Sequence, residues 1–203
     1  MKIICIGRNF ANHALEMKST VPTNPMFFMK PDVALLRPNT PFFYPDFSKE
    51  IHYECELVFR ISRTGKNIAE KFAHKYYSEV GLGIDFTARD LQDFCKKNGH
   101  PWEIAKSFEG SAALSKEFIS KEDIDLNNLN FSLMKNGKVV QSGNSNDMIF
   151  NIDRLIAYIS QFMTLKIGDL IYTGTPEGVG PIEIGDELAG YIGEREMFLV
   201  KVK

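Results

Sequence analysis

The sequence predicts an α+β fold that is mainly β, built from mixed sheets with a few short helices. Short apolar runs dominate the second half of the chain, and Gly-rich turns separate them. Gly-Asp pairs at 168–169 and 185–186 precede two of these runs, which fits the turns of a rolled or barrel-like sheet. Long helices do not alternate with the strands, so the pattern argues against a doubly wound sheet.

The first half of the chain contains short strands separated by loops. Four apolar runs have the length of strands, at 2–6, 25–29, 51–61 and 78–85. Prolines make the segment 36–50 extended or looped. A short helix is expected at 9–17, where Asn9 or Asn12 could cap it.

Two further helices are expected in this half, at 68–77 and at 87–97. The second has an apolar face made of Leu91, Phe94 and Cys95, with Lys96 among the residues on the outer side.

In the second half, Asn136-Gly137 is a strong signal for a type I′ hairpin between strands at 129–135 and 138–142. An amphipathic helix is expected at 147–162. Further strands are expected at 169–173, 187–192 and 197–202.

Length and composition limit the class of protein. A chain of 203 residues, 44% hydrophobic and 25% charged, is expected to form one globular domain spanning 1–203. The net charge of −2 gives no electrostatic case for binding nucleic acid or an anionic membrane. The N-terminal apolar run is too short for a signal peptide, and no run reaches the roughly 18 residues of a membrane span. Cys5, Cys55 and Cys95 are far apart without C-x-x-C spacing, which predicts reduced thiols and a cytoplasmic protein.

Three carboxylates form the strongest candidate for a functional site. Glu54 and Glu56 share one face of a strand, because side chains at i and i+2 point the same way, and Asp85 ends a second apolar segment. Adjacent carboxylates repel unless a cation lies between them. An all-oxygen set suits Mg²⁺ or Mn²⁺, Ca²⁺ less well (though a crystal could hold it), and Zn²⁺ poorly. The alternative is that the Glu-x-Glu pair lies on a solvated sheet face.

Other residues have two readings each. His13 and Glu16 lie one helical turn apart, as a general base and its orienting carboxylate would, or as surface residues of a short helix. Lys106 is an active-site cation or a strand-edge lysine. Arg8 could bind a substrate carboxylate or make a structural salt bridge. The Gly-rich loop at 174–180, which lacks the P-loop lysine, is a tight turn or an anion-binding loop.

Together these motifs resemble the fumarylacetoacetate hydrolase family, close to its short acylpyruvase and oxaloacetate-decarboxylase branch. Motifs in the family's order run from residue 7 nearly to the C-terminus, at 7–17, 53–57, 85–92, 101–102, 105–108, 141–150 and 173–180. The order of the motifs is far more specific than any one of them. The resemblance implies a β-roll of mixed sheets and a homodimer.

The resemblance also implies roles for single residues. Metal ligands for Mg²⁺ or Mn²⁺ would be Glu54, Glu56 and Asp85, and catalytic residues would be His13, Glu16 and Lys106. The substrate site would be lined by Arg8, Gln92 and Thr175. Residues 8–35 would form a lid that orders when substrate binds. The chain departs from many relatives at 109–114 and at Asp32, whose charge would disfavour dianionic substrates if it faced the pocket.

The function implied first is hydrolysis of the C–C bond of acylpyruvates, giving pyruvate and a carboxylic acid, with oxaloacetate decarboxylation possible at the same site. Alternatives are isomerisation or decarboxylation of unsaturated 2-oxo dioic acids from aromatic catabolism, and tautomerisation of oxaloacetate. All of them take a small 2-oxo acid as substrate. A non-enzymatic binding protein is the least favoured alternative, because no residue of the expected site is missing.

Overall fold

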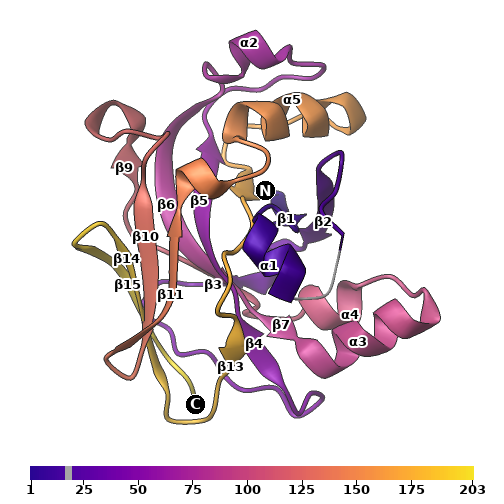
Figure 1. Ribbon diagram of the computed structural model, residues 1–203, viewed down its shortest axis with the longest axis vertical. Helices are drawn as coiled ribbons and strands as arrows, with labels where there is room; N and C mark the ends of the chain where they lie inside the picture. The colour runs from indigo at the N-terminus through magenta and orange to yellow at the C-terminus, as the bar shows by residue number, and fades with distance from the viewer. Residues whose placement is uncertain (17–19) are drawn as a thin grey trace.

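The structure, a computed structural model, describes residues 1–16 and 20–203 and is mainly β (Figure 1). Its strands are β1 (Ile3–Gly7), β2 (Met26–Lys30), β3 (Leu35–Leu36), β4 (Ile51–Tyr53), β5 (Cys55–Ile61), β6 (Tyr77–Asp85), β7 (Thr87–Ala88), β8 (Ala112–Leu114), β9 (Ile119–Ser120), β10 (Asn130–Lys135), β11 (Lys138–Asn144), β12 (Leu170–Tyr172), β13 (Gly180–Pro181), β14 (Glu187–Ile192) and β15 (Arg195–Lys201). Its α-helices are α1 (Ala11–Glu16), α2 (Glu70–Ala73), α3 (Arg89–Asn98), α4 (Glu103–Lys106) and α5 (Ile152–Phe162).

The strands form three sheets of mixed direction. The largest has the order β2-β1-β12-β5-β6-β8-β3, and β9 also pairs with β6. A second sheet has the order β11-β10-β14-β15, and a small third one has the order β13-β4-β7. Figure 1 shows these sheets curling around a common interior, with α5 along one end and α3 and α4 beside β7. The expected rolled, mixed-sheet fold is therefore confirmed.

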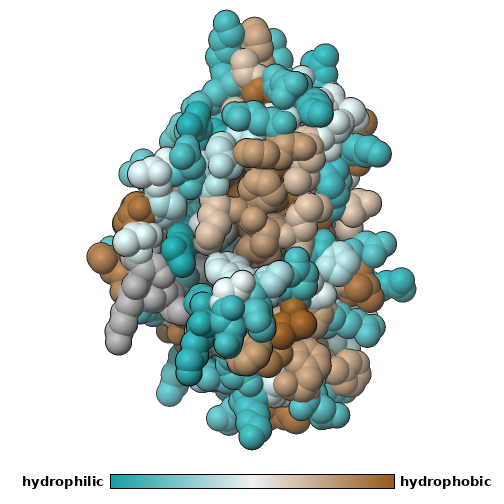
Figure 2. Space-filling view, turned by 90° about the vertical axis from the view of Figure 1, so that its right-hand side faces the viewer, coloured by the Kyte–Doolittle hydropathy of each residue, from teal (hydrophilic) through white to brown (hydrophobic). Residues whose placement is uncertain are grey.

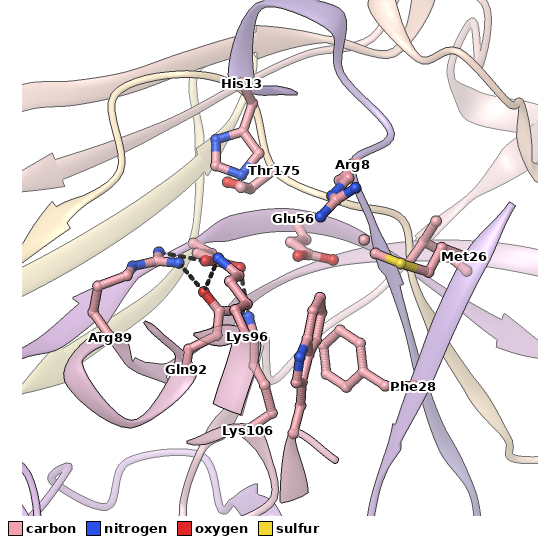
Figure 3. A pocket seen from close by; sticks show the side chains of 14 residues that line it. Arg8, His13, Met26, Phe28, Glu56, Arg89, Gln92, Lys96, Lys106 and Thr175 are labelled. Atoms are coloured by element: carbon pink, nitrogen blue, oxygen red, sulfur yellow. Dashed lines mark hydrogen bonds and ion pairs between the residues drawn. The ribbon is translucent and has the colours of Figure 1, made fainter. Parts of the chain in front are cut away.

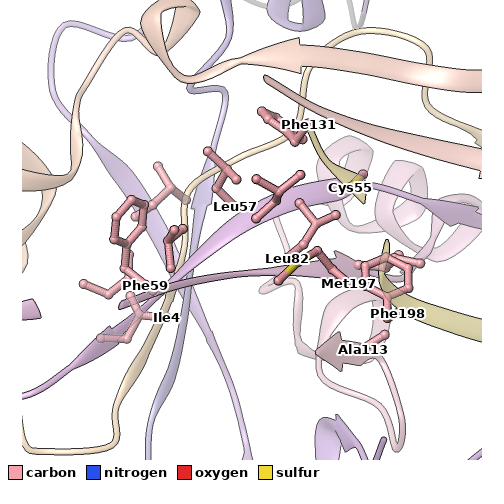
Figure 4. Packing of buried hydrophobic residues seen from close by; sticks show 14 of the residues in the cluster. Ile4, Cys55, Leu57, Phe59, Leu82, Ala113, Phe131, Met197 and Phe198 are labelled. Carbon is pink, nitrogen blue, oxygen red and sulfur yellow. The ribbon is translucent and has the colours of Figure 1, made fainter. Parts of the chain in front are cut away.

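The interior is filled by apolar side chains from all three sheets. Leu57 and Leu82 are fully buried and Phe131 is nearly so, although they come from β5, β6 and β10 (Figure 4). Cys55 belongs to the same cluster, as the alternation along its strand predicts. Burial of this continuous apolar surface is the main force that holds the sheets together. All three cysteines are free and buried.

The hairpin and the turns follow the sequence closely. Asn136 and Gly137 connect β10 to β11 with φ of 52° and 78°, the positive values that a type I′ turn requires. Gly168 and Gly185 also have positive φ, 87° and 99°, at the two Gly-Asp turns before β12 and β14.

Several expected boundaries are wrong. The strand expected at 51–61 is broken at Glu54, and its halves β4 and β5 belong to different sheets. The helix expected at 68–77 is only the single turn α2. The helix expected at 147–162 begins later, at Ile152, because the Asn151 side chain caps it by accepting a hydrogen bond from the Arg154 N–H. The described part of the helix expected at 9–17 is α1, and residue 17 lies outside the described residues.

Asn9 was one of the two residues expected to cap α1, but its side chain does not do so. Its fully buried side-chain amide donates to the carbonyls of Phe150 and Thr173 and accepts from the Phe150 N–H. These hydrogen bonds tie the start of α1 to the strand end at β12. The helix is therefore held over the end of the large sheet, where Figure 1 shows it beside β1.

No α-helix within residues 1–16 and 20–203 is long and apolar enough to cross a lipid bilayer.

Candidate active site

The three expected ligand carboxylates come together at the break between β4 and β5. Glu54 occupies the break, Glu56 follows in β5, and Asp85 is the last residue of the neighbouring strand β6. One oxygen from each residue lies within 4.8 Å of the other two. Glu54 is 6% exposed and the other two are 1% exposed, so the alternative of a solvated sheet face is wrong.

Three buried cations surround this group. The Lys106 Nζ lies 2.7 Å from Glu54 Oε2 and 2.9 Å from Asp85 Oδ2. The Arg89 Nη2 donates to Glu54 Oε1 at 2.6 Å, and the Lys30 Nζ lies 2.7 Å from Asp85 Oδ1. Burial by itself would raise the pKa of Glu54, but Lys106 and Arg89 hold it below its ordinary value.

The charge balance is incomplete at Glu56. Burial and the neighbouring carboxylates of Asp85 and Glu54 raise the pKa of Glu56 well above its ordinary value. A hydrogen bond of 2.7 Å from the Gly174 N–H to the Glu56 carboxylate acts in the opposite direction and lowers this pKa. Gly174 has a φ of 95°, which directs its N–H at the carboxylate. Gly is suited to that backbone conformation, which explains its place in the loop.

The Asp85 Oδ1 atom is also incompletely satisfied. It is buried and accepts no hydrogen bond from any described residue, although the Lys30 ammonium pairs with it at 2.7 Å. Three buried carboxylates that converge on one point, one of them with a raised pKa, fit a hard divalent cation such as Mg²⁺ or Mn²⁺.

His13 lines the cavity from α1, and the partly exposed Glu16 lies one turn further along the helix. The His13 Nδ1 lies 3.1 Å from Glu16 Oε2, and the other carboxylate oxygen accepts a hydrogen bond of 3.1 Å from the Gly178 N–H. Because a carboxylate oxygen is an acceptor, this contact assigns the ring proton to Nδ1 and leaves the lone pair on Nε2. His13 is 7% exposed, which excludes the alternative of a surface histidine.

The helix that carries this pair is also tied to the opposite rim. Asn12 Nδ2 donates to Glu177 Oε1 at 3.2 Å, next to the contact between Glu16 and Gly178. Residues 17–19 of the expected lid lie outside the described residues.

Arg8 and Thr175 also line the cavity. Arg8 directly follows β1 with φ of 59° and makes no salt bridge with any described residue, so its salt-bridge alternative is not supported. The Thr175 hydroxyl oxygen accepts a hydrogen bond of 2.9 Å from the Gln141 amide. Its own O–H is therefore left to donate to a substrate oxygen.

Gln92 is fixed by two cations of α3. Its Oε1 accepts from Arg89 Nη1 at 2.6 Å and from Lys96 Nζ at 2.8 Å. Because the oxygen is committed to two donors, the amide orientation is determined and its NH₂ group remains as a donor. Residues 89, 92 and 96 follow i, i+3, i+7 spacing and therefore lie along one face of the helix.

These side chains enclose a cavity of about 40 Å³, large enough for a few water molecules with α1 in place (Figure 3). Phe28 and Trp102, whose ring centroids are 6.0 Å apart, form an aromatic wall. The Lys106 ammonium lies 5.1 Å from the centre of the Phe28 ring. Lys106 ends α4 and is 2% exposed, so it is not a strand-edge lysine.

Sequence reasoning missed Lys30, Arg89, Lys96 and Gln141. Arg89 and Lys96 could have been found from the i, i+3, i+7 spacing with Gln92, directly after the strand that ends in Asp85. Lys96, expected on the outer side of the helix, is indeed exposed there but also lines the cavity, whereas Phe94 of the expected apolar face is 50% exposed. Lys30 and Gln141 have no local signal, because they reach the site only through the fold.

The fold and site define a class of mainly β protein with a buried, cation-bridged set of carboxylates beneath a helix that carries a histidine–glutamate pair. The family model for the fumarylacetoacetate hydrolase C-terminal domain matches residues 2–201. The chain belongs to this family, whose members are enzymes that act on oxo acids.

Relatives and solved structures agree with this assignment. The chain is 43% identical over 197 residues to the mitochondrial oxaloacetate tautomerase FAHD1 of Bos taurus, covering 96% of this chain and 89% of the relative. It is 43% identical over 189 residues to the oxaloacetate tautomerase YcgM of Escherichia coli, covering 92% and 86%.

Among solved structures, a fumarylpyruvate hydrolase from Pseudomonas aeruginosa, described in complex with Mn²⁺ and pyruvate, matches with a TM-score of 0.93 and 33% identity, covering 100% of this chain and 89% of that one. A fumarylacetoacetate hydrolase family protein from Yersinia pestis matches with a TM-score of 0.94 and 39% identity, covering 100% and 93%.

Proposed function

We propose that this protein is a Mg²⁺- or Mn²⁺-dependent enzyme that interconverts the keto and enol forms of oxaloacetate. The observation that carries the proposal is the pairing of two features across one small cavity. Glu54 and Glu56, whose carboxylates converge with that of Asp85, line the cavity together with His13, whose Nδ1 contacts Glu16. The two relatives named as oxaloacetate tautomerases support the choice of reaction.

Glu54, Glu56 and Asp85 would hold the metal ion, which when bound supplies Lewis-acid stabilisation of negative charge on the keto oxygen of a 2-oxo acid. The remaining chemistry belongs to the protein. His13 Nε2 removes a proton from C3, and the electron pair of the broken C–H bond moves into an enolate. The resulting imidazolium, stabilised by Glu16, returns the proton to the C2 oxygen, so no proton is lost or gained.

Two groups stabilise the charge that develops on the substrate. Burial alone would lower the pKa of Lys106, but Asp85 and Glu54 raise it, so this side chain remains an ammonium group. It acts as a fixed positive charge and not as a base. The Thr175 hydroxyl, whose oxygen is occupied by Gln141, donates its hydrogen to an enolate or carboxylate oxygen.

With α1 in place, the cavity of about 40 Å³ holds only a few water molecules, so α1 must move before any of the candidate acids can enter. Asp32 is exposed and does not line the cavity, so its charge does not oppose a dianion there.

The second candidate is hydrolysis of acylpyruvates, which the sequence put first. It is supported by the fumarylpyruvate hydrolase structure and by the same histidine. His13 would then take a proton from water as its oxygen attacks the distal carbonyl. The C–C bond breaks, releasing a carboxylic acid and leaving the electron pair on pyruvate enolate. Loss of CO₂ from oxaloacetate would leave the same enolate.

We also propose that residues 8–35 act as a lid and that the protein is a homodimer. The contacts of Asn12 and Glu16 with the 177–178 loop support closure of α1 over the cavity. β2 is an edge strand of the large sheet, and Figure 2 shows an apolar band on the face that carries β2 and the end of α5. The rings of Phe27 and Phe162 lie 5.9 Å apart there. Light scattering after size exclusion would measure the mass; a monomer at micromolar concentration would contradict the dimer.

The experiment that tests the function compares two reactions of the purified protein with Mg²⁺ and with EDTA. Enol–keto conversion of oxaloacetate is followed by ultraviolet absorbance, and pyruvate release from acetylpyruvate by a coupled assay. Mg²⁺-dependent acceleration of the first, exceeding the second, is expected. Faster pyruvate release would favour the hydrolase, and no metal-dependent effect on either would refute both candidates.

A further inference from the structure

Lys96 is the cavity cation that none of the roles above uses. Lys106 and Arg89 each form a salt bridge with Glu54, and Lys30 lies against Asp85. Among the described residues that line the cavity, Arg8 and Lys96 are the cations that pair with none of the three ligand carboxylates. Their charges are available to a bound anion.

The Lys96 ammonium is held in position by contacts with uncharged groups. It donates to Gln92 Oε1 at 2.8 Å and lies 5.9 Å from the centre of the Trp102 ring. The nearest carboxylate, Asp93, is 3.8 Å away and 66% exposed, so it compensates the charge little. Burial and the nearby Arg89 guanidinium lower the pKa of Lys96, as expected for a cation that lacks a close counter-ion.

The neighbouring amide completes an anion site. Two cations fix the Gln92 oxygen, so its NH₂ group is a donor on the same helical face as Lys96. Figure 3 shows Arg8 on the other side of Glu56 from Arg89 and Gln92. A substrate with one carboxylate can use only one of these two cationic sides, whereas a dicarboxylate can use both.

We infer that Lys96, with the Gln92 amide, binds the second carboxylate of a dicarboxylic 2-oxo acid and so makes the site selective for four-carbon diacids over monocarboxylic acids. The inference rests on the proposed function, since it takes the first carboxylate and keto group to lie at the metal ligands. Lys96 is a specificity residue here, and His13 and Glu16 keep their roles.

The test measures binding and not turnover. L-malate and L-lactate are 2-hydroxy acids that differ by the second carboxylate, and neither has a keto group to tautomerise. The chain has one tryptophan, Trp102, and it lines the cavity, so its fluorescence reports binding of either acid at a fixed Mg²⁺ concentration. The wild-type protein is expected to bind malate about ten- to hundredfold more tightly than lactate, as one charge-assisted contact predicts.

Lys96→Met is expected to weaken malate binding at least about tenfold more than lactate binding. Lys97→Met is the matched control, because Lys97 is exposed on the same helix and does not line the cavity; it should keep the wild-type preference. Lys96→Gln, which removes the charge but keeps an N–H donor, should also lose most of the preference, and it serves if thermal melting shows that Lys96→Met does not fold.

Three results would overturn the inference. The Lys96 variants could lose malate and lactate affinity equally, Lys97→Met could lose the malate preference to the same extent, or the wild-type protein could show no preference for malate. The result is independent of catalysis. Selective binding of malate without tautomerase or hydrolase activity would refute the proposed function but support the carboxylate subsite. Activity without selective binding would support the proposed function and refute the subsite.

Discussion

Replacing Lys30 with Met should destabilise the protein far more than any surface substitution. The Lys30 side chain has no exposed area, and its ammonium group lies 2.7 Å from Asp85 Oδ1. It also donates to the carbonyls of Ser111, at 3.0 Å, of Phe86, at 3.3 Å, and of Lys106. Met fills nearly the same volume, so the change removes the charge and the donors while largely preserving the packing.

The size of the effect follows from what remains buried. Removing one partner of a buried ion pair costs about 3–5 kcal/mol, because the other charge stays desolvated. An unfolding entropy of about 2.1 cal/mol/K per residue converts this, for 203 residues, to a fall in Tm of about 7–12 °C. The fall should be smaller in saturating Mg²⁺, since a cation at the carboxylates would compensate Asp85.

The measurement is thermal unfolding by circular dichroism in EDTA and in Mg²⁺. Lys201→Met is the control, because the Lys201–Glu187 pair is exposed and 3.5 Å long and should contribute less than about 1 kcal/mol. A Tm of Lys30→Met within about 2 °C of the wild type would refute the claim that this buried cation supports the carboxylate group.

Three further predictions concern the site and its surroundings. Asp85→Ala should abolish Mg²⁺-dependent turnover and weaken Mg²⁺ binding as measured by calorimetry. Unchanged activity would refute the assignment of Asp85 as a metal ligand. Glu16→Gln should reduce kcat by about 10²–10⁴-fold with little change in KM, because His13 loses its orienting carboxylate; an effect on KM alone would contradict this role. Asp90→Asn should flatten the acid limb of a Tm–pH curve. Burial tends to raise the pKa of Asp90, but hydrogen bonds from Ser48 and from backbone N–H groups lower it. The stabilisation by Asp90 is therefore present above the ordinary pKa near 3.8 and is lost as pH falls through the lowered folded value. Identical acid limbs in the two proteins would show that these hydrogen bonds do not matter.

Local signals predicted the turns and most strands because their causes are local. The Asn136-Gly137 turn depends on the positive φ that these two residues tolerate, and β14 occupies the expected residues, 187–192. The prediction of a helix at 68–77 was wrong because its cause is not local. Its pattern suits a helix, but only one turn forms, since most helical stability comes from tertiary packing.

The strand break at Glu54 was not visible in the sequence. Residues 51–61 have continuous strand character, yet β4 pairs with β7 and β13 while β5 pairs with β6 and β12. A strand that changes sheets must interrupt its own pairing, and the partners that force the interruption are distant in the chain. That interruption places Glu54 beside Asp85, with the Asp85 N–H donating to the Glu54 carbonyl at 2.8 Å.

The sequence by itself determined the mainly β rolled fold and brought forward the three carboxylates and the His13–Glu16 pair, because alternation and helical spacing are properties of neighbouring residues. Tertiary structure alone decided which cations surround those carboxylates. Lys30, Arg89 and Gln141 act at the site through contacts spanning 55, 35 and 34 positions of the chain, to Asp85, Glu54 and Thr175. Such contacts form only once strands and helices that are distant in the chain have been assembled, because charge pairing in a buried site depends on distance in space and not on spacing in the sequence.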